Sequence, residues 1–291
     1  MKRINKIKRA LLVICILLAL ICSEIVYSNF IVVISRYTVR SNKAAGGIRV
    51  VFIADLHGRE FGADNSRLIK RIAEEEPDLI ALVGDIIDSD ADDEQIGRMC
   101  AFISAAADIA PVYFGMGNHE YTYIKAHGAA LAERIEEAGA TVLECGYLDM
   151  EINGTPVRIG GYGGYYRTPH MNRDDREREA EDMRFFEDFE DTDRFKLLLN
   201  HIPTNWLDWD YDDKTPVDLV LCGHYHGGIV RIPIAEKGLY APYVGWFPPY
   251  TKGCFEGKTA TCVLTTGMAS ANGIPRFFNP PEIVVVDICP E

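Results

Sequence analysis

The chain has 291 residues, of which 48% are hydrophobic, and this length allows one large α/β domain with a substantial core, or two small domains. Its 43 acidic residues outnumber its 30 basic residues, which gives a formal net charge of −13. Nucleic-acid binding is not expected, because phosphate backbones are bound by stripes of Lys and Arg and the sequence has none. A phosphorylated small molecule stays compatible with this charge if bound metal cations reverse the local field.

The N-terminal segment differs in composition from the rest of the chain. Residues 1–9 form a basic tail, and the apolar stretch that follows runs, with a few polar interruptions, over residues 10–34. This stretch is long enough to cross a bilayer with some tilt. A cleavable signal peptide and an interfacial or buried helix are the alternatives, but no cleavage site of the A-x-A type follows the apolar core. We therefore expect an uncleaved transmembrane anchor.

The charges on either side of the anchor predict its orientation. The basic residues before and after it are Lys2, Arg3, Lys6, Lys8 and Arg9, against Arg36, Arg40 and Lys43. This excess favours a cytoplasmic N-terminus with the main domain outside the membrane. Residues 35–47 are expected to form a linker and residues 48–291 a single domain. The eight cysteines contain no C-x-x-C pair and do not settle the compartment; a Cys254–Cys262 bridge across a hairpin stays open.

Beyond the linker, strand patterns alternate with helix patterns. Short runs rich in β-branched residues predict buried strands over 48–54, 78–83 and 111–116. Helical spacing of apolar residues predicts helices over 66–76, 94–107 and 129–138. Alternation of this kind indicates βαβ units, and hence an α/β fold with a mainly parallel sheet.

The second half of the domain is richer in strands. Short strands are expected over 141–145, 147–152 and 157–161, with an Asn-Gly turn at Asn153–Gly154. A highly charged helix with a solvated face is expected over 172–190. The remaining strands are predicted over 196–200, 218–222, 261–266 and 283–288.

Residues of types that commonly bind metals stand immediately after five of the predicted strands. They lie in the segments Asp55-Leu56-His57, Gly84-Asp85-Ile86-Ile87-Asp88, Gly117-Asn118-His119-Glu120, Asn200-His201 and Gly223-His224-Tyr225-His226. Taken singly, each segment is also compatible with a helix cap, an ordinary turn or a structural histidine. Five of the seven histidines share this placement, however, and the carboxyl ends of strands in open α/β sheets converge on one crevice. The set therefore predicts a single site, with His127 and His170 left on the surface.

These blocks, in this order, resemble the calcineurin-like metallophosphoesterase superfamily, whose pattern is D-x-H, G-D-x-x-D, G-N-H-[DE], a later H and G-H-x-H. The resemblance covers residues 48–288, and the stretches 223–233 and 273–288 are similar to a membrane-anchored bacterial subgroup. It implies a four-layer α/β/β/α sandwich, in which two mixed β-sheets are flanked by helices, after the N-terminal transmembrane helix.

The resemblance also implies a dinuclear metal site. The first metal would be held by Asp55, His57, Asp85 and His226, and the second by the bridging Asp85 with Asn118, His201 and His224. Mixed oxygen and nitrogen ligands suit Mn²⁺, Zn²⁺ or Fe and do not suit a Ca²⁺ site. Because only two of these ligands are anionic, two divalent ions would leave the site net positive and able to bind phosphate.

The reaction implied is hydrolysis of a phosphomonoester, phosphodiester or pyrophosphate by in-line attack of a metal-bridging hydroxide. His119 would stabilise or protonate the leaving oxygen, and Asp88 (or Glu120) would orient its ring. Arg59 and Arg231 are candidate phosphate contacts. The anchor favours a lipid-linked or envelope substrate, while a soluble nucleotide is equally compatible with the motifs.

Two alternatives come from other classes of protein. A metal-binding scaffold with a degenerate site is one, but such proteins lose a ligand or the catalytic His, and here every position is filled. An amide hydrolase is the other, and the intact G-N-H-E block argues against it. Two further segments stay open: 160–166 as a substrate-facing loop or a hairpin turn, and 240–250 as a contact for lipid, a contact for an apolar part of the substrate, or a cap on the core.

Overall fold

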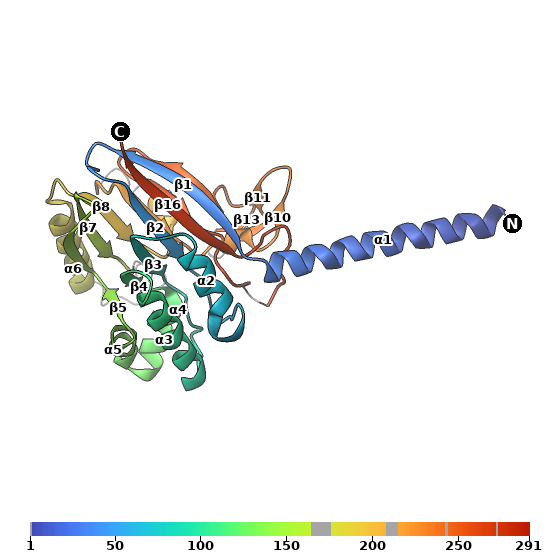
Figure 1. Cartoon of the computed structure of the whole chain (residues 1–291), viewed down its shortest axis with the longest axis horizontal. Coiled ribbons are helices and arrows are strands. Elements are labelled where there is room, and N and C mark those ends of the chain that lie inside the picture. The colour runs from blue at the N-terminus through green and yellow to red at the C-terminus, as the bar shows by residue number, and fades with distance from the viewer. Residues whose placement is uncertain (1, 164–175, 208–214, 242–243, 272) are drawn as a thin grey trace.

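Two six-stranded sheets form the centre of the domain (Figure 1). The computed structural model describes residues 2–163, 176–207, 215–241, 244–271 and 273–291. In spatial order, the first sheet consists of β1 (Val33–Ser41), β16 (Glu282–Pro290), β2 (Ile48–Ile53), β3 (Leu79–Val83), β4 (Val112–Gly115) and β5 (Ala140–Leu143). The second consists of β14 (Gly253–Glu256), β15 (Thr261–Leu264), β9 (Leu219–Cys222), β8 (Phe195–Leu199), β7 (Thr155–Gly161) and β6 (Gly146–Ile152).

Helices cover the outer face of each sheet, so the predicted four-layer α/β/β/α sandwich is confirmed (Figure 1). The first sheet is covered by α2 (Ser66–Ala73), α3 (Asp93–Ala107), α4 (Asn118–His127) and α5 (Ala130–Glu137), and the second by α6 (Arg176–Glu190). Shorter elements are η1 (Ala63–Asn65), α7 (Thr204–Leu207), η4 (His226–Gly228) and the small strands β10 (Arg231–Ile232), β11 (Lys237–Gly238), β12 (Tyr240–Ala241) and β13 (Gly245–Trp246).

The central strands are continuous apolar runs because both of their faces are buried. In β2, Val51 and Ile53 pack toward the helices, whereas Val50 and Phe52 pack between the two sheets. Successive strand side chains point to opposite faces, so a strand in the middle of a four-layer structure needs an apolar residue at every position. This requirement explains why the sequence identified these strands and their ends.

Strand β1 corrects the prediction for residues 35–47, which were expected to form a linker. The strand pairs in parallel with β16 over nine residues, from Val33 with Glu282 to Ser41 with Pro290. It lies at the edge of the sheet and alternates only weakly between apolar and polar residues, so its pattern merged with the apolar stretch before it. The predicted anchor 10–34 likewise extends too far toward the C-terminus, because α1 (Lys2–Phe30) ends before β1 begins.

Helix α1 projects away from the domain (Figure 1). Its segment Lys6–Phe30 is long and apolar enough to cross a membrane, and its most apolar part is not buried against the protein. Helix α4 was not predicted, since the sequence suggested a polar loop at its first turn. Cys254 pairs in the sheet with Val263 and not with Cys262, and neither of the two cysteines forms a disulfide, so the hairpin bridge is absent. His127 is exposed as expected, and His170 lies outside the described residues.

Phe52→Ala tests the layer between the two sheets. Phe52 is fully buried, and removal of a buried Phe side chain costs about 3–5 kcal/mol of unfolding free energy. We expect a large fall in the urea midpoint, measured by circular dichroism on the detergent-solubilised chain. Leu148→Ala, at a position 42% exposed, is the control and should change the midpoint little. Equal shifts for the two variants would contradict the layer assignment.

Candidate dinuclear metal centre

The loops that follow the central strands are joined to one another by backbone hydrogen bonds. Asp55 N donates to Gly84 O at 3.0 Å, and His57 N donates to Asp85 O at 2.9 Å, which ties the loop after β2 to the loop after β3. In the second sheet, Gly223 N donates to His201 O at 2.9 Å. The strand ends of each sheet therefore hold their polar side chains at fixed relative positions.

Backbone strain concentrates at the predicted ligands. Five non-glycine residues of the site have left-handed φ values, namely Asp55 (55°), His57 (48°), Asp85 (53°), His224 (70°) and His226 (46°). Such a conformation costs on the order of 1–3 kcal/mol per residue and persists only where the surrounding structure imposes it. Local propensity thus does not explain these loops, whereas a requirement to aim their side chains at one point does.

The predicted metal ligands lie in two groups that meet at Asp85. Asp55, His57 and His226 form one group and Asp85, His201 and His224 the other, with the potential ligand atoms of each group within 4.8 Å of one another. His201 Nε2 is 3.0 Å from Asp85 Oδ2 and 3.8 Å from Asp55 Oδ1. His57 Nε2, from the other group, is 3.8 Å from Asp85 Oδ2. This is the geometry expected of a carboxylate shared by two cation sites.

Buried atoms without partners show that these residues fit metal ions. Among the described residues, His57 Nε2 and Asn118 Oδ1 are buried and have no hydrogen-bond partner. An unsatisfied buried polar atom is costly, so its presence needs an explanation. In two other histidines of the site, Nδ1 contacts a backbone carbonyl and leaves Nε2 facing the site. His201 Nδ1 lies 2.7 Å from Val83 O, and His226 Nδ1 lies 3.1 Å from Ala269 O. Such contacts orient a histidine so that Nε2 can bind a metal.

The buried charges influence one another strongly. Burial opposes the charged form of His201, but Asp85 outweighs it and raises the pKa of His201 to about 10. Burial likewise opposes ionisation of Asp85, yet His201 lowers the pKa of that carboxyl. Burial lowers the pKa of His226 to about 4 and holds the pKa of His224 well below its usual value. The raised pKa of His201 favours a second proton on its ring, at Nε2 facing Asp85, which is the position that a divalent cation would take.

Asp88 and His119 form the most open part of the site, with side chains 39% and 31% exposed. Asp88 Oδ1 is 2.8 Å from His57 Nδ1 and 3.6 Å from His119 Nδ1, so its hydrogen bond is made to His57. His119 Nδ1 instead accepts a hydrogen bond from Ser89 N at 3.1 Å. Since Nδ1 is an acceptor, the neutral ring carries its proton on Nε2.

Glu120 does not orient His119, contrary to the alternative drawn from the sequence. Its buried carboxylate accepts hydrogen bonds from Asp85 N (2.8 Å), Ile86 N (2.7 Å) and Gly117 N (2.9 Å). Burial raises the pKa of Glu120, and these bonds to backbone N–H groups partly offset that effect. Glu120 therefore fixes the loop that carries Asp85.

Arg59 and Arg231 make other contacts than the phosphate contacts predicted for them. The Arg59 guanidinium lies over the ring of Phe30, 5.4 Å from its centroid, and donates to Asn29 O at the end of α1. Arg231 donates to Gly227 O at 3.2 Å and Thr251 Oγ1 at 2.9 Å. Both residues are close to ligands in sequence, but in the structure they brace loops, and the phosphate contact stays a prediction.

Arg276 and Asn279 are functional residues that the sequence reasoning missed. The fully buried Arg276 donates to Ala269 O at 2.5 Å, the same carbonyl that lies against His226 Nδ1. Asn279 Nδ2 donates to His226 O at 2.8 Å. Burial lowers the pKa of Arg276 to about 9. The stretch was noted only as part of a family resemblance, because a side chain that supports backbone carbonyls leaves no pattern in sequence.

Glycines make room for the carboxylates. A Cβ on Gly117 would lie 2.3 Å from Asp85 Oδ1, and one on Gly84 would lie 2.6 Å from Gly117 Cα. Gly84 also has a φ of 73°, which favours glycine. The close approach of the two loops thus depends on the absence of side chains at both positions.

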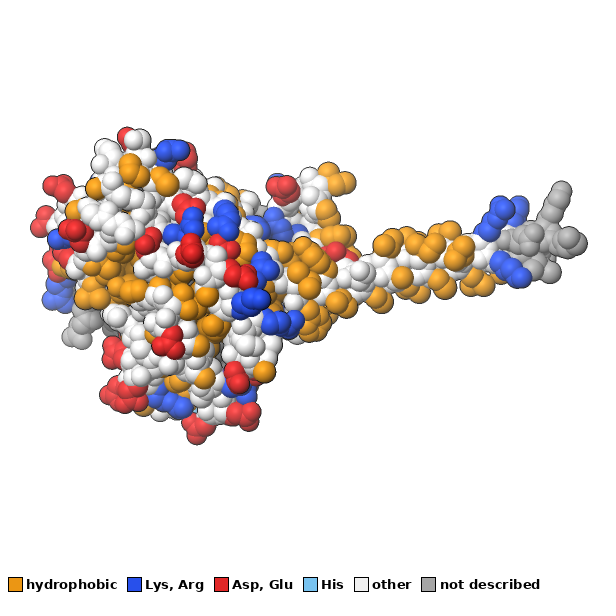
Figure 2. All heavy atoms as spheres, in the orientation of Figure 1, with side chains coloured by type: hydrophobic (Ala, Val, Ile, Leu, Met, Phe, Trp, Pro, Cys, Tyr) orange, Lys and Arg blue, Asp and Glu red, His pale blue; other side chains and the backbone are white. Residues whose placement is uncertain are grey.

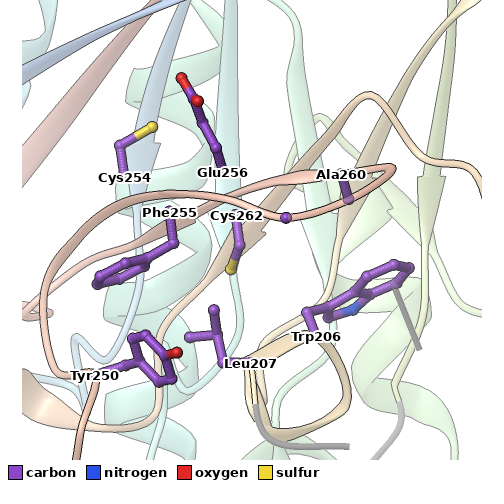
Figure 3. A pocket seen from close by; sticks show the side chains of 9 residues that line it. Trp206, Leu207, Tyr250, Cys254, Phe255, Glu256, Ala260 and Cys262 are labelled. Atoms are coloured by element: carbon purple, nitrogen blue, oxygen red, sulfur yellow. The ribbon is translucent and has the colours of Figure 1, made fainter. Parts of the chain in front are cut away.

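A separate cavity of about 320 Å³ shares no lining residue with the metal-ligand groups (Figure 3). It is lined by Trp206 and Leu207 of α7, by Tyr250, and by Phe255 and other residues of the β14–β15 hairpin. Its one carboxylate, Glu256, points away from Tyr250 and Leu207. We assign the chemistry to the cluster at the strand ends, because within the described part of the chain this is the cluster that combines carboxylates with several imidazoles.

Two ligand groups that lie on either side of one buried carboxylate, at the carboxyl ends of strands in a four-layer sandwich, are typical of a dinuclear metallohydrolase. The model of the calcineurin-like phosphoesterase family matches residues 48–228, and the chain belongs to this family. It is a metal-dependent phosphoester hydrolase. Family members bind two divalent metals, and the ligand groups for them are present here.

Individual relatives are moderately similar over most of their length. The chain is 28% identical to phosphodiesterase YaeI of Escherichia coli, over 84% of this chain and 83% of that protein. It is 27% identical to the uncharacterized metallophosphoesterase YkuE of Bacillus subtilis, over 82% of this chain and 78% of that protein. Among solved structures, TT1561 of Thermus thermophilus is 13% identical, with a TM-score of 0.49 and coverage of 76% of this chain and 90% of that one.

Gly117→Ala tests the fit around Asp85. Its methyl group would displace the carboxylate, so we expect the bound metal, measured by elemental analysis, to fall from about two ions per chain to one or fewer. Gly97→Ala is the matched control, since a Cβ there meets nothing within 4 Å and lies in helix α3. The control should keep its metal and gain about 0.5–1 kcal/mol of stability. Full metal content in Gly117→Ala would contradict the proposed position of Asp85.

Proposed function

We propose that the chain hydrolyses phosphodiesters, and related phosphomonoester or pyrophosphate bonds, with two transition-metal ions of the Mn, Zn or Fe type. The observation that carries the proposal is the meeting of the two ligand groups at Asp85, with buried donor atoms that have no partner within the described protein. Nitrogen and oxygen donors together favour transition metals over Ca²⁺.

In this proposal, Asp55, His57, Asp85 and His226 hold one ion, and Asp85, Asn118, His201 and His224 hold the other. Bound cations would lower the pKa of a coordinated water and neutralise charge on the phosphoryl oxygens. The buried carboxylates Asp55 and Asp85 are the only anionic ligands, so the loaded site is net positive. An acidic chain can bind a phosphate group there.

His119 is proposed to act on the leaving group. Its Nε2 carries a proton, because Nδ1 accepts the hydrogen bond from Ser89. Its ring is partly exposed beside the ligands, 4.5 Å from the ring of His57 between centroids, where a substrate can reach it. Its Nε2–H group would donate a hydrogen bond to the leaving oxygen as that oxygen gains negative charge, and Asp88, whose Oδ1 lies 3.6 Å from His119 Nδ1, would keep the ring in position.

The substrate is proposed to be a lipid-linked or envelope phosphoester. Support comes from the apolar helix α1, and from a relative named as a phosphodiesterase. A soluble nucleotide is the second candidate, because the metal ligands themselves do not select the alcohol part of the ester. A degenerate scaffold is disfavoured, since every predicted ligand position and His119 are occupied by groups able to act.

Helix α1 is proposed to anchor the protein with its N-terminus in the cytoplasm and the catalytic domain outside the membrane. The basic residues that precede its apolar segment support this orientation. The chain has a net charge of −13, so anionic lipid headgroups would repel it. A membrane anchor therefore explains membrane association better than electrostatic attraction does.

His119→Ala tests the catalytic role. We expect kcat toward bis-p-nitrophenyl phosphate with Mn²⁺ to fall by about 10²–10⁴, while metal content stays unchanged, because the ring donates to substrate and does not bind the ions. His127→Ala is the matched control: the same helix α4 carries this histidine, exposed at its far end. Unchanged turnover in His119→Ala would remove the residue from the mechanism. Absence of turnover by the unaltered chain with any divalent metal would favour the scaffold.

Cys145 allows a test of topology, because its side chain is exposed in the catalytic domain. In intact cells, or in spheroplasts if an outer envelope blocks the reagent, a membrane-impermeant maleimide should label the protein. Cys145→Ser should lose most of that label. Labelling of Cys145 only after the cells are lysed would reverse the proposed orientation.

A further inference from the structure

Exposed large hydrophobic residues are concentrated beside the metal centre. Outside α1 and Ile31, the described residues include eight of them, and six come from three segments near His226 and Arg276. We call these six the apolar rim: Ile232, Ile234, Trp246, Phe247, Ile274 and Phe278. Ile234 is 100% exposed, Trp246 68% and Phe247 61%. Single exposed hydrophobic residues are ordinary, but a cluster marks an interaction surface.

Hydrogen bonds join the three segments of the rim into one unit. Arg231 N donates to Phe277 O at 2.9 Å, which connects β10 to the loop that carries Phe278. Leu239 N donates to Val230 O at 2.8 Å, and Phe247 N donates to Leu239 O at 2.8 Å, which connects the β10–β11 hairpin to the β12–β13 hairpin. The hairpins follow directly after the metal ligand His226.

The last turns of α1 are bonded to the same loop. Asn29 Nδ2 donates to Arg276 O at 2.9 Å, Phe278 N donates to Glu24 Oε1 at 2.9 Å, and Asn279 N donates to Ser28 Oγ at 3.0 Å. Figure 1 shows β10, β11 and β13 on the side of the domain from which α1 emerges. In Figure 2, apolar side chains gather on this part of the domain and at the base of the helix, and continue along it.

The length of α1 determines where this joint lies in a membrane. From Arg9 to Asn29 the helix rises over 20 residues, which is about 30 Å at 1.5 Å per residue. The hydrocarbon core of a bilayer is about 30 Å thick. With Arg9 at one surface, the last turn of α1, which carries Ser28 and Asn29, therefore reaches the other surface, and the loop that is bonded to these two residues lies there with it.

We infer that the apolar rim inserts into the headgroup region of the bilayer that α1 spans, and holds the metal centre at the lipid surface. This inference rests on the proposed membrane anchoring of the chain. Aromatic residues such as Trp and Phe favour this interface, and the joint between α1 and loop 276–279 places them at its level. The centre is then presented to phosphoesters of membrane lipids, which would need no transfer through water.

Tryptophan fluorescence can test this inference without any measurement of hydrolysis. The chain has three tryptophans, Trp206, Trp209 and Trp246, and α1 contains none. We expect that the full chain, reconstituted in phosphatidylcholine vesicles, is quenched when the acyl chains carry bromine near the headgroup. Trp246→Phe should lose more than half of this quenching. Equal fluorescence in brominated and plain vesicles, or full quenching in Trp246→Phe, would overturn the inference.

A matched pair of charge substitutions sharpens the test. Phe247→Asp should lift the rim from the bilayer and weaken the quenching of Trp246, because a carboxylate is poorly accommodated at that depth. Leu148→Asp, at an exposed apolar position of β6, should leave the quenching unchanged. If the rim were instead an interface between copies of the chain, cross-linking would report a dimer and bromine would not quench Trp246, which would overturn the inference.

Hydrolysis of bis-p-nitrophenyl phosphate in the same vesicles separates the two proposals. This soluble ester does not depend on contact with lipid. Turnover without quenching overturns membrane docking and leaves the enzymatic proposal standing. Quenching without turnover supports docking and contradicts the proposed function.

Discussion

The whole site depends on the buried carboxylate of Asp85. It lies against His201, faces His57 from the other ligand group, and accepts a hydrogen bond from His119 N at 2.8 Å. An ionised carboxylate with so little access to water is stable only if cations or N–H groups surround it. The left-handed backbone at Asp85, the small residues around it and the imidazoles that face it are consequences of this one requirement.

The Gly-Asn-His-Glu block shows how four consecutive residues meet that requirement in different ways. Gly117 leaves space for the Asp85 carboxylate, and the Asn118 amide oxygen points inward without a partner. His119 donates its backbone N–H to Asp85, and its ring accepts a hydrogen bond from Ser89 N through Nδ1. Glu120 reaches back to the N–H groups of the Asp85 loop. Because α4 begins at Asn118, one helical turn directs all four groups.

The strands and helices whose apolar pattern follows from burial could be predicted from the sequence. Contacts between residues that are far apart in the sequence could not. The central strands were predicted because strands buried on both faces are continuous apolar runs, and the polar residues that follow these strands lie together in the structure. Strand β1 was missed because an edge strand that follows an apolar helix shows no distinct boundary. Arg59 and Arg231 are near predicted ligands in sequence, and in the structure their guanidinium groups contact Asn29 O and Thr251 Oγ1, so a phosphate contact by either residue stays a prediction. Arg276 acts on backbone carbonyls, and such contacts have no signature in the chain.

Helix α1 is joined to the catalytic domain too firmly to be a simple tether. It ends at Phe30, and β1 begins at Val33 and continues into a nine-residue pairing with β16. Its polar side chains meanwhile bond the loop of Arg276 and Asn279, which in turn supports the backbone around His226. A flexible linker would let the domain turn freely above a membrane, whereas this joint fixes its orientation relative to the helix. The residues that hold the backbone of His226 in place therefore also determine which way the site faces relative to α1.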